Sequence, residues 1–320
     1  MSKIRCAVIG VGYLGRFHAQ KYHLLPNVEL VGVCDVNPES CEAVSKELNV
    51  PAYLNYRELF GSVDAVSIAA TTNKHYEIAL DCLKQGIHVL IEKPITETVE
   101  QANELIQIAK MNHVKLQVGH LERFNSARLA LDDYLDAPLF IESQRLAPFN
   151  PRGADVNVIL DLMIHDIDII QNIVQSPIKS IMAHGAPVLT QDIDIANARI
   201  TFANHCVANV TASRISFKVE RKTRIFQDNS YISIDYQNKQ FAVFKKGTGE
   251  MFPGIPDITM DQKEFEKGDA LLEEIKSFVK CVDQDTVPMV TGEEGRDALK
   301  TAEKITTLIN SNLVERYATS

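Results

Sequence analysis

The first residues with a spacing suited to chemistry form a glycine-rich turn, Gly10-Val11-Gly12-Tyr13-Leu14-Gly15. The turn follows an apolar run that predicts a β-strand and opens a helical pattern. Glycines at these positions allow a tight turn and a close backbone approach, so the helix N-terminus can offer N–H groups to a pyrophosphate. Asp35, at the end of the second predicted strand, would accept hydrogen bonds from ribose hydroxyls. A tight turn in a ligand-free domain is the competing interpretation, and these features together disfavour it.

The residues after Asp35 indicate which dinucleotide would fit. Val36, Asn37 and Pro38 include no Arg or Lys that would neutralise a 2′-phosphate. The sequence therefore favours NAD over NADP as the cofactor.

A second group of polar residues follows two later strands, which are predicted over 64–69 and 87–91. Ala70-Thr71-Thr72-Asn73 follows the first of them and Glu92-Lys93-Pro94 follows the second. In a doubly wound sheet, ligands bind beyond the carboxyl ends of the strands. Pro94 disfavours helical geometry at Lys93, and a partly desolvated lysine beside a nicotinamide would exchange protons near neutral pH. An exposed turn would be the preferred interpretation of this tripeptide anywhere else in the chain.

The predicted cofactor-binding set combines the glycine turn, the acidic residue after the second strand and the two strand ends. It consists of Gly10, Gly12, Tyr13, Leu14, Gly15, Asp35, Thr71, Thr72, Asn73, His75, Glu92 and Lys93.

A third group lies in a helix predicted from about 156 to 174. Asp161, His165 and Asp168 are spaced i, i+4 and i+7, which places them on one helical face within an apolar segment. A salt-bridged interior helix and a metal site are two interpretations. A metal is disfavoured because no second histidine or carboxylate cluster completes a coordination shell, so we predict no metal. His165 acting as a general acid or base, oriented by a carboxylate, fits better.

Several weaker signals concern a phosphorylated substrate. Arg123, Arg145 and Arg152 would bind a phosphate bidentately, although surface arginines usually have no such role. His120 closes the strand predicted over 115–118 and is either a cleft residue or a structural histidine.

The elements that must position these residues fall into two patterns. Over residues 1–121, short apolar runs alternate with helical patterns, which predicts a doubly wound parallel sheet, a Rossmann domain. Over 122–320, a helix (124–135) and a strand (139–146) precede alternating segments (178–246) typical of an antiparallel sheet. A loop is expected over 247–268 and helices over 269–282 and 293–312. The predicted fold class is α/β, with a second α+β domain that contains a large, mostly antiparallel sheet.

The length and composition of the chain limit the number of domains and the class of protein. With 320 residues, 45% apolar and 23% charged, the chain is long enough for about two domains and is neither disordered nor collagenous. A net charge of −9 gives no electrostatic basis for nonspecific nucleic-acid or anionic-membrane binding. Six scattered cysteines suggest free thiols, and no signal-peptide pattern is seen, so we expect a cytoplasmic protein.

These groups, in this order, resemble the glucose-fructose oxidoreductase and inositol dehydrogenase family, known as Gfo/Idh/MocA. The resemblance extends over nearly the whole chain. It implies that Lys93 and His165 are the catalytic pair and that Asp161 helps to bind a sugar. We expect residues 122–320 to bind substrate and, from the small or apolar residues on their sheet, to form a homodimer or homotetramer through it: Ala203, Val207, Ala208 and Ser213.

Two further stretches, 118–125 and 145–152, resemble the sugar-nucleotide branch of this family. That resemblance implies NAD-dependent oxidation of the C3 hydroxyl of a UDP-N-acetylhexosamine, UDP-GlcNAc, to a 3-keto sugar for 3-amino-sugar, lipid A or surface polysaccharide biosynthesis. Asp161, Arg145, Arg152 and His120 would bind this substrate. The alternatives are oxidation of the corresponding uronate, oxidation of a free polyol such as inositol, and a non-catalytic NAD-binding regulatory protein.

Overall fold

The fold is taken from a computed structural model that describes residues 3–150, 156–265 and 268–318. The chain divides into two compact units. The first unit comprises Met1–Phe124 and Asp269–Leu299, and the second comprises Asn125–Gly268 and Lys300–Ser320. The first boundary falls close to the predicted one at residue 121. Asp269–Leu299, however, belongs to the first unit and not to the second domain that was expected to contain it.

A parallel sheet forms the centre of the first unit. Its strands are β1 (Ile4–Ile9), β2 (Val28–Cys34), β3 (Ala52–Tyr53), β4 (Ala65–Ile68), β5 (His88–Glu92) and β6 (Leu116–Gly119). Within the described residues their order is β3-β2-β1-β4-β5-β6, and every neighbouring pair is parallel. The predicted doubly wound sheet is confirmed, and its strand order reverses between β1 and β4, where such folds bind ligands.

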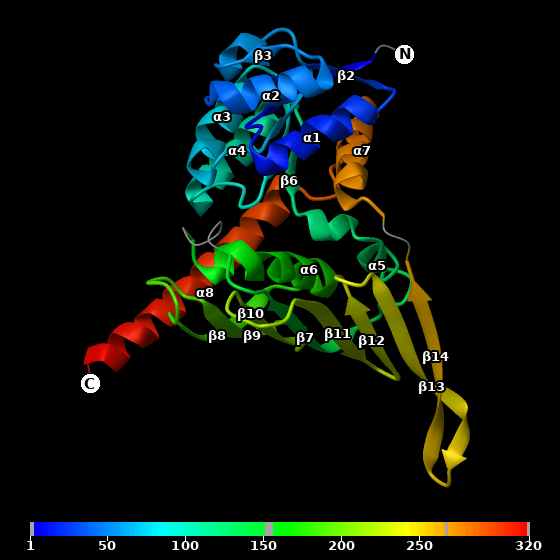
Figure 1. Ribbon diagram of the computed structural model, residues 1–320. Coiled ribbons are helices and arrows are strands. Elements are labelled where there is room, and N and C mark those ends of the chain that lie inside the picture. The colour runs from blue at the N-terminus through cyan, green and yellow to red at the C-terminus, as the bar shows by residue number, and fades with distance from the viewer. Residues whose placement is uncertain (1–2, 151–155, 266–267, 319–320) are drawn as a thin grey trace. The chain divides into compact units, whose positions relative to one another are not determined.

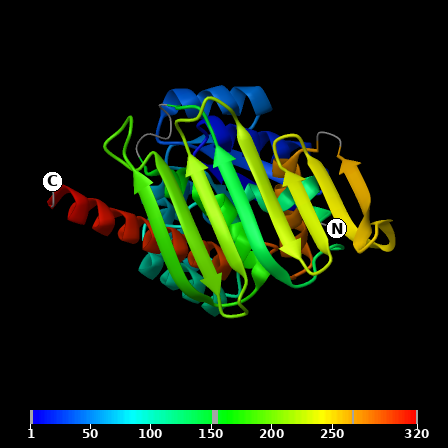
Figure 2. The same cartoon turned by 90° about the horizontal axis from the view of Figure 1, so that it is seen from below.

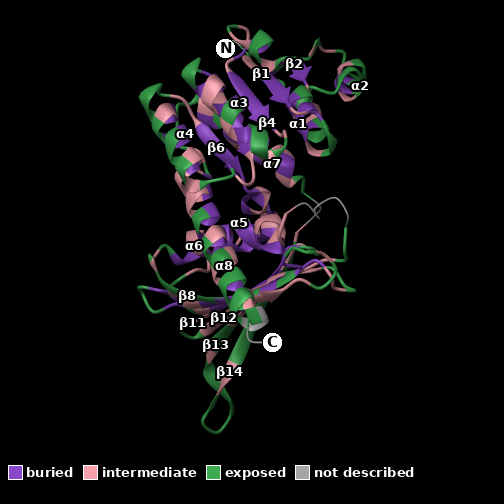
Figure 3. Ribbon diagram, turned by 90° about the vertical axis from the view of Figure 1, so that its left-hand side faces the viewer, coloured by how far each residue is buried: buried purple, intermediate pink, exposed green. Residues whose placement is uncertain are grey.

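Helices cover this sheet (Figure 1). They are α1 (Tyr13–Leu24), α2 (Pro38–Leu48), α3 (Thr72–Lys84), α4 (Val99–Met111) and α7 (Ala270–Asp283), with short 3₁₀ turns η1 (Tyr56–Leu59) and η2 (Leu121–Phe124). Figure 3 shows β1, β4 and β6 buried, whereas α2 and α4 have exposed faces. Such two-sided burial explains why these strands are continuous apolar runs in the sequence.

Helix α7 joins the first unit because of its apolar stripe. Leu271, Ile275 and Phe278 pack in one core cluster with Tyr22 of α1 and Leu90 of β5. Asp269 caps the helix by accepting a hydrogen bond from the Leu272 N–H. Local sequence patterns could not predict that α7 packs in the first unit, since it lies more than a hundred residues beyond β6.

An antiparallel sheet dominates the second unit. Its strands are β7 (Pro138–Leu146), β8 (Ile178–Ala186), β9 (Ile195–Phe202), β10 (Val207–Ser213), β11 (Glu220–Gln227), β12 (Ser230–Asp235), β13 (Gln240–Phe252) and β14 (Ile255–Glu264). Among the described strands the order is β14-β13-β12-β11-β7-β10-β9-β8, and only β7 and β10 pair in parallel. The large, mostly antiparallel sheet is therefore confirmed.

The prediction of a loop over 247–268 is wrong. Most of it lies in the β13–β14 hairpin, which turns at Gly254 with φ of +79°. Beyond Lys245 the residues on both strands are largely exposed, so no buried face imposes the alternation by which a strand is recognised.

Two helices of the second unit are shorter than expected, and the last helix of the chain is longer than the one predicted over 293–312. The helix predicted over 124–135 is reduced to α5 (Ser126–Leu129), and the one predicted over 156–174 consists of a π-helix, η3 (Ile159–Met163), followed by α6 (Ile164–Val174). The last helix, α8 (Gly292–Ala318), extends from one unit into the other. Figure 2 shows the sheet with its strands in front, and α6 packs against β7 and β10 of this sheet.

Two further findings bear on the sequence analysis. All six cysteines lie in the described part of the chain, and each is a buried free thiol. In the same part of the chain, we find no helix with the length and apolarity to cross a membrane.

Candidate functional site

The glycine turn between β1 and α1 has the geometry of a phosphate-binding loop. Gly10 has φ of +83°, and a Cβ there would lie 2.5 Å from the Ala70 nitrogen, so only glycine fits. Gly15 packs against the Gly10 backbone, which brings the helix close to the sheet. Gly12, at the N-cap of α1, has open space where a Cβ would stand, and no side chain caps the helix. The helix N-terminus is thus open to an anion at the residue where a pyrophosphate would approach.

Asp35 links the end of β2 to this turn. One carboxylate oxygen accepts a hydrogen bond from the Val11 N–H at 2.8 Å, and the other accepts one from the Asn37 N–H at 2.9 Å. A carboxylate accepts about four hydrogen bonds, so each oxygen keeps a lone pair for another donor. Together with the open turn, this arrangement fits the ribose and pyrophosphate of NAD.

His75 braces the ends of β4 and β5. Its ring nitrogens lie 3.0 Å from the Ala70 carbonyl oxygen and 2.9 Å from that of Pro94, and the side chain is buried. Burial lowers the pKa of His75, although the two carbonyl oxygens oppose this shift. Since both nitrogens face the backbone, the geometry gives His75 a positioning role next to the predicted cofactor residues. Thr71 donates a hydrogen bond to Asn73 at the start of α3.

The Glu92-Lys93-Pro94 segment leaves the end of β5. Lys93 is half-buried, and the Lys93–Pro94 peptide bond is cis. The Lys93 N–H donates to one Glu92 carboxylate oxygen at 3.3 Å, and His18 Nε2 lies 3.0 Å from the other. A Cβ at Gly119 of β6 would lie 2.9 Å from the Glu92 carboxyl group. The glycine therefore leaves room for the carboxylate that sits beside Lys93.

A second acidic group, from α7, meets the His18–Glu92 pair. Glu274 is fully buried, and ligand atoms of His18, Glu92 and Glu274 lie within 4.8 Å of one another. Burial raises the pKa of Glu274 well above its ordinary value, and the nearby Glu92 carboxylate adds to the shift. Among the described residues this is one set compact enough for a cation, but metal ligands must be deprotonated, and the raised pKa of Glu274 favours its protonated form. We assign no metal to it.

In the second unit, Asp161 lies in η3 and His165 in the first turn of α6. Both are half-buried, and Asp168 is buried. The i, i+4, i+7 spacing assumed one continuous α-helix, whereas a π-turn separates Asp161 from the α-helical residues. Single π-turns inside helices occur often at functional sites, because they displace side chains from the regular positions.

Arg145 forms a buried ion pair with the residue after His165. Its guanidinium donates to both Asp166 oxygens, at 2.7 and 3.3 Å, and each side chain is at most 3% exposed. Ser143 also donates to Asp166, at 2.9 Å. The pair fastens α6 to β7. Substrate binding by Arg145 stays a prediction, and the geometry favours a positioning role.

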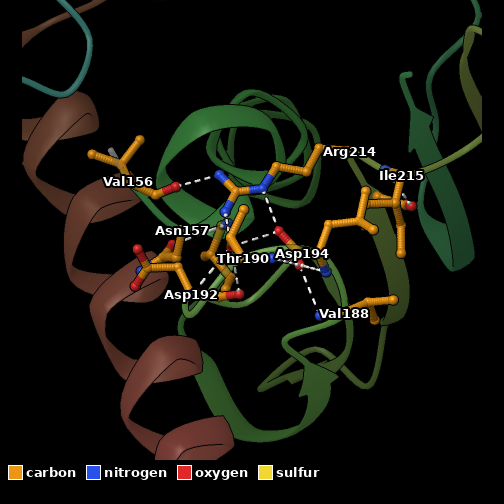
Figure 4. A network of polar contacts seen from close by, with 11 residues as sticks. Val156, Asn157, Val188, Thr190, Asp192, Asp194, Arg214 and Ile215 are labelled. Atoms are coloured by element: carbon orange, nitrogen blue, oxygen red, sulfur yellow. Dashed lines mark hydrogen bonds and ion pairs between the residues drawn. The ribbon is translucent and has the colours of Figure 1, made fainter. Parts of the chain in front are cut away.

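A second polar network fixes the start of the same helix (Figure 4). Asp194 accepts hydrogen bonds from the Val188, Leu189 and Thr190 N–H groups and from Arg214. Burial alone would raise the pKa of Asp194, but these donors hold it well below its ordinary value. Arg214 also donates to the Val156 carbonyl oxygen.

Asn157 caps the start of this helical segment. Asn157 accepts hydrogen bonds from the Ile159 and Leu160 N–H groups, at 3.1 and 3.0 Å. The segment leading into Asp161 and His165 is thereby held at its backbone.

The remaining predicted substrate residues have different outcomes. His120 is buried at the end of β6, and its role in binding stays a prediction. Arg152 lies outside the described residues. Arg123 pairs with Glu294 at 2.8 Å.

Thus the structure brings the predicted cofactor residues to one edge of the first unit and places His165 and Asp161 on one helical segment of the second. Sequence reasoning missed His18 and Glu274. A signal for Glu274 existed, since it occupies the apolar stripe of α7 between Leu271 and Phe278.

Comparison with known proteins extends these observations. A model described as an oxidoreductase family with an NAD-binding Rossmann fold, GFO_IDH_MocA, matches residues 4–120, and the GFO/IDH/MocA C-terminal domain matches 117–233. The UDP-N-acetylglucosamine 3-dehydrogenase of Acidithiobacillus ferrooxidans is 37% identical over 98% of this chain and 99% of its own. A solved structure of that enzyme superimposes with a TM-score of 0.92, covering 97% of this chain and 99% of the other.

A more distant relative is the scyllo-inositol 2-dehydrogenase (NAD⁺) of Bacillus subtilis. It is 28% identical over 90% of this chain and 89% of its own.

Proposed function

The chain belongs to the GFO/IDH/MocA oxidoreductase family and carries its NAD-binding Rossmann domain, and from that premise we propose that it oxidises the C3 hydroxyl of UDP-N-acetylglucosamine to a ketone with NAD⁺. The observation that carries the proposal is the 37% identity to a UDP-N-acetylglucosamine 3-dehydrogenase over nearly the full length of both chains.

The residues of the site support this reaction. Bound NAD⁺ supplies a hydride acceptor at its nicotinamide ring. Lys93 and His165 are the proposed acid–base pair, one of which removes the proton of the substrate hydroxyl. Asp161 is the proposed partner of the sugar, and His120, Arg145 and Arg152 are proposed to assist in binding the nucleotide sugar. Asp35 selects NAD by accepting hydrogen bonds from the ribose hydroxyls.

Oxidation of a free polyol is the second candidate, because the Bacillus subtilis relative acts on scyllo-inositol. The test is a panel of UDP-N-acetylglucosamine, its uronate, UDP-glucose and inositols, each with NAD⁺ and with NADP⁺, followed by absorbance of the reduced nicotinamide. We expect turnover with UDP-N-acetylglucosamine and NAD⁺. Turnover with inositols alone would favour the second candidate, and reduction by no compound would favour a regulatory NAD-binding role.

The proposed reaction also suggests a biosynthetic role and a cellular location. A 3-keto sugar nucleotide is a substrate for transamination, so we place the enzyme in 3-amino-sugar synthesis for lipid A or surface polysaccharide. Buried thiols and a nucleotide cofactor agree with a cytoplasmic location.

We also propose a homo-oligomer formed through the sheet of the second unit. Four aromatic rings form a row across neighbouring strands, with centroids 5.8, 5.0 and 5.3 Å apart: Phe140, Phe226, Tyr231 and Phe244. Met260 continues the row, opposite Phe244, and is 55% exposed. An apolar row of this kind is suited to burial against a second copy.

A further inference from the structure

We propose that His18, Glu92 and Glu274 form a buried positioning cluster, in which Glu274 keeps its proton and donates it in a hydrogen bond that fixes the Glu92 carboxylate beside Lys93. The inference rests on the proposed function only for its kinetic consequence. The cluster itself lies wholly within the first unit.

Both carboxylate oxygens of Glu92 have hydrogen-bonding neighbours. One of its oxygens lies 3.0 Å from His18 Nε2 and the other accepts the Lys93 N–H at 3.3 Å. Its side chain is 12% exposed and that of His18 is 1% exposed. A charged carboxylate so removed from water must be held by hydrogen-bond donors. Whatever fixes Glu92 therefore also fixes the backbone of Lys93.

Burial favours the protonated form of the Glu274 side chain. It is 0% exposed and sits in the apolar stripe of α7, and within the described chain neither of its oxygens has a hydrogen-bond partner. An ionised carboxylate there would lack any compensating donor, whereas a protonated one is neutral and carries an O–H donor. The raised pKa of Glu274, caused by burial and by the Glu92 charge, agrees with the protonated form.

Among the groups near Glu274, Glu92 offers a carboxylate oxygen within 4.8 Å as an acceptor of that proton. From α1 come His18 and Tyr22, and the Tyr22 hydroxyl lies 2.8 Å from the Ser67 hydroxyl. From β6 comes Gln117, whose amide N–H faces the Glu274 backbone oxygen at 3.5 Å. The Cys6 thiol of β1, beyond Tyr22, is buried with its pKa raised by burial.

Two charged residues lie on η2, which also packs against α7. They are Glu122 and Arg123, and Arg123 is paired with Glu294 at 2.8 Å.

The test uses two variants of similar volume. Glu274→Gln retains an N–H donor toward Glu92, whereas Glu274→Leu retains the volume without a donor. We expect Glu274→Gln to keep kcat within about twofold and Glu274→Leu to lower kcat by about tenfold, with the Kd for NAD unchanged in both. Gly119→Ala is an independent probe, since its Cβ would displace the Glu92 carboxyl group, and it should lower kcat similarly.

A second measurement does not depend on the substrate. Because the pKa of Glu274 is raised in the folded chain, the stability gained from its proton is complete below the unfolded pKa and declines as pH rises toward the folded pKa. Glu274→Gln removes that decline. Its Tm should therefore exceed the wild-type Tm by a margin that widens as pH rises above the unfolded pKa of about 4.3.

The outcomes separate the two proposals. A wild-type enzyme without turnover on UDP-N-acetylglucosamine contradicts the proposed function, and the Tm series still decides the cluster. Equal loss of kcat in Glu274→Gln and Glu274→Leu, a constant Tm margin, or a stoichiometric divalent cation in the purified protein that chelation removes with a fall in Tm would each overturn the cluster.

Discussion

At the scale of single residues, proton transfer and cofactor choice are assigned to few side chains. Lys93 is half-buried at the end of β5, and His165 is half-buried in the first turn of α6. The Lys93 backbone N–H donates to Glu92, and Asp166, the residue after His165, pairs with Arg145. This separation of reacting and positioning groups makes the two kinds of residue distinguishable by kinetics.

Replacing either proposed acid–base residue should affect chemistry and not cofactor binding. General acid–base catalysis contributes about 10² to 10⁴-fold, so Lys93→Met and His165→Asn should each lower kcat by that order. Steady-state kinetics and calorimetric titration with NAD measure the two effects. Normal turnover in both variants would remove the assignment.

Asp35 should determine which dinucleotide binds. Hydrogen bonds to a charged group contribute about 1.5 to 3 kcal/mol, so Asp35→Ala should weaken NAD binding by about 10 to 150-fold. The variant also loses the Val11 and Asn37 contacts, and Asp35→Asn serves as the matched control because it keeps the shape of the side chain. An unchanged Kd for NAD in Asp35→Ala contradicts the ribose contact.

At the scale of elements, the sequence predicted most of the first unit and less of the second. The strands β1, β2, β4, β5 and β6 are buried on both faces, so each stands out as an apolar run. The β3 strand has two residues and no such signal, and the exposed β13–β14 hairpin has no buried face. The π-turn at Ile159–Met163 was not predictable from local sequence. The start of this helix is held by the Arg214 contact with Val156, which comes from a distant part of the chain.

Within the site, sequence spacing identified groups that follow one another in the chain and missed those that meet only in space. The glycine turn, Asp35 and the Glu92-Lys93-Pro94 segment were found by spacing. His18 and Glu274 contribute to the same site from α1 and α7, and no local pattern connects them. A single acidic residue in an apolar helical stripe was the available signal, and its meaning required the fold.

The Arg145–Asp166 pair should stabilise α6 as a unit. Removing one member of a buried ion pair costs about 3 to 5 kcal/mol, because the other charge is left without a partner. We expect Asp166→Ala or Arg145→Met to lower the free energy of unfolding by that amount, and the double variant to cost less than the sum. Denaturant unfolding measures the cycle, and strict additivity would show that the pair does not act as one.

The Asp194 network predicts a pH dependence of opposite sign to that of Glu274. Since the pKa of Asp194 is lowered in the folded chain, its contribution is present above its unfolded pKa of about 3.9 and is lost as pH falls toward the folded pKa. Asp194→Asn should therefore be less stable than wild type near neutral pH, with a difference that shrinks below about pH 4. A difference independent of pH, measured by denaturant titration, would contradict this assignment.

For the molecule as a whole, we propose self-association through the sheet of the second unit. The aromatic row crosses β7, β11, β12 and β13, and Met260 of β14 continues it. Tyr231→Glu places a charge in the middle of this row. We expect it to reduce the molecular mass measured by light scattering from that of a dimer or tetramer to that of a monomer, with Lys179→Glu on β8 as the control. A monomeric wild-type protein would contradict the proposed assembly.

If hydride leaves C3 of UDP-N-acetylglucosamine, deuterium placed at that carbon must pass to the nicotinamide. The protein is incubated with NAD⁺ and substrate that carries deuterium at C3, and the reduced nicotinamide is analysed by mass spectrometry. We expect reduced cofactor that is heavier by one deuterium and a keto sugar that has lost it. Reduced cofactor without the label, or none at all, would contradict the claim.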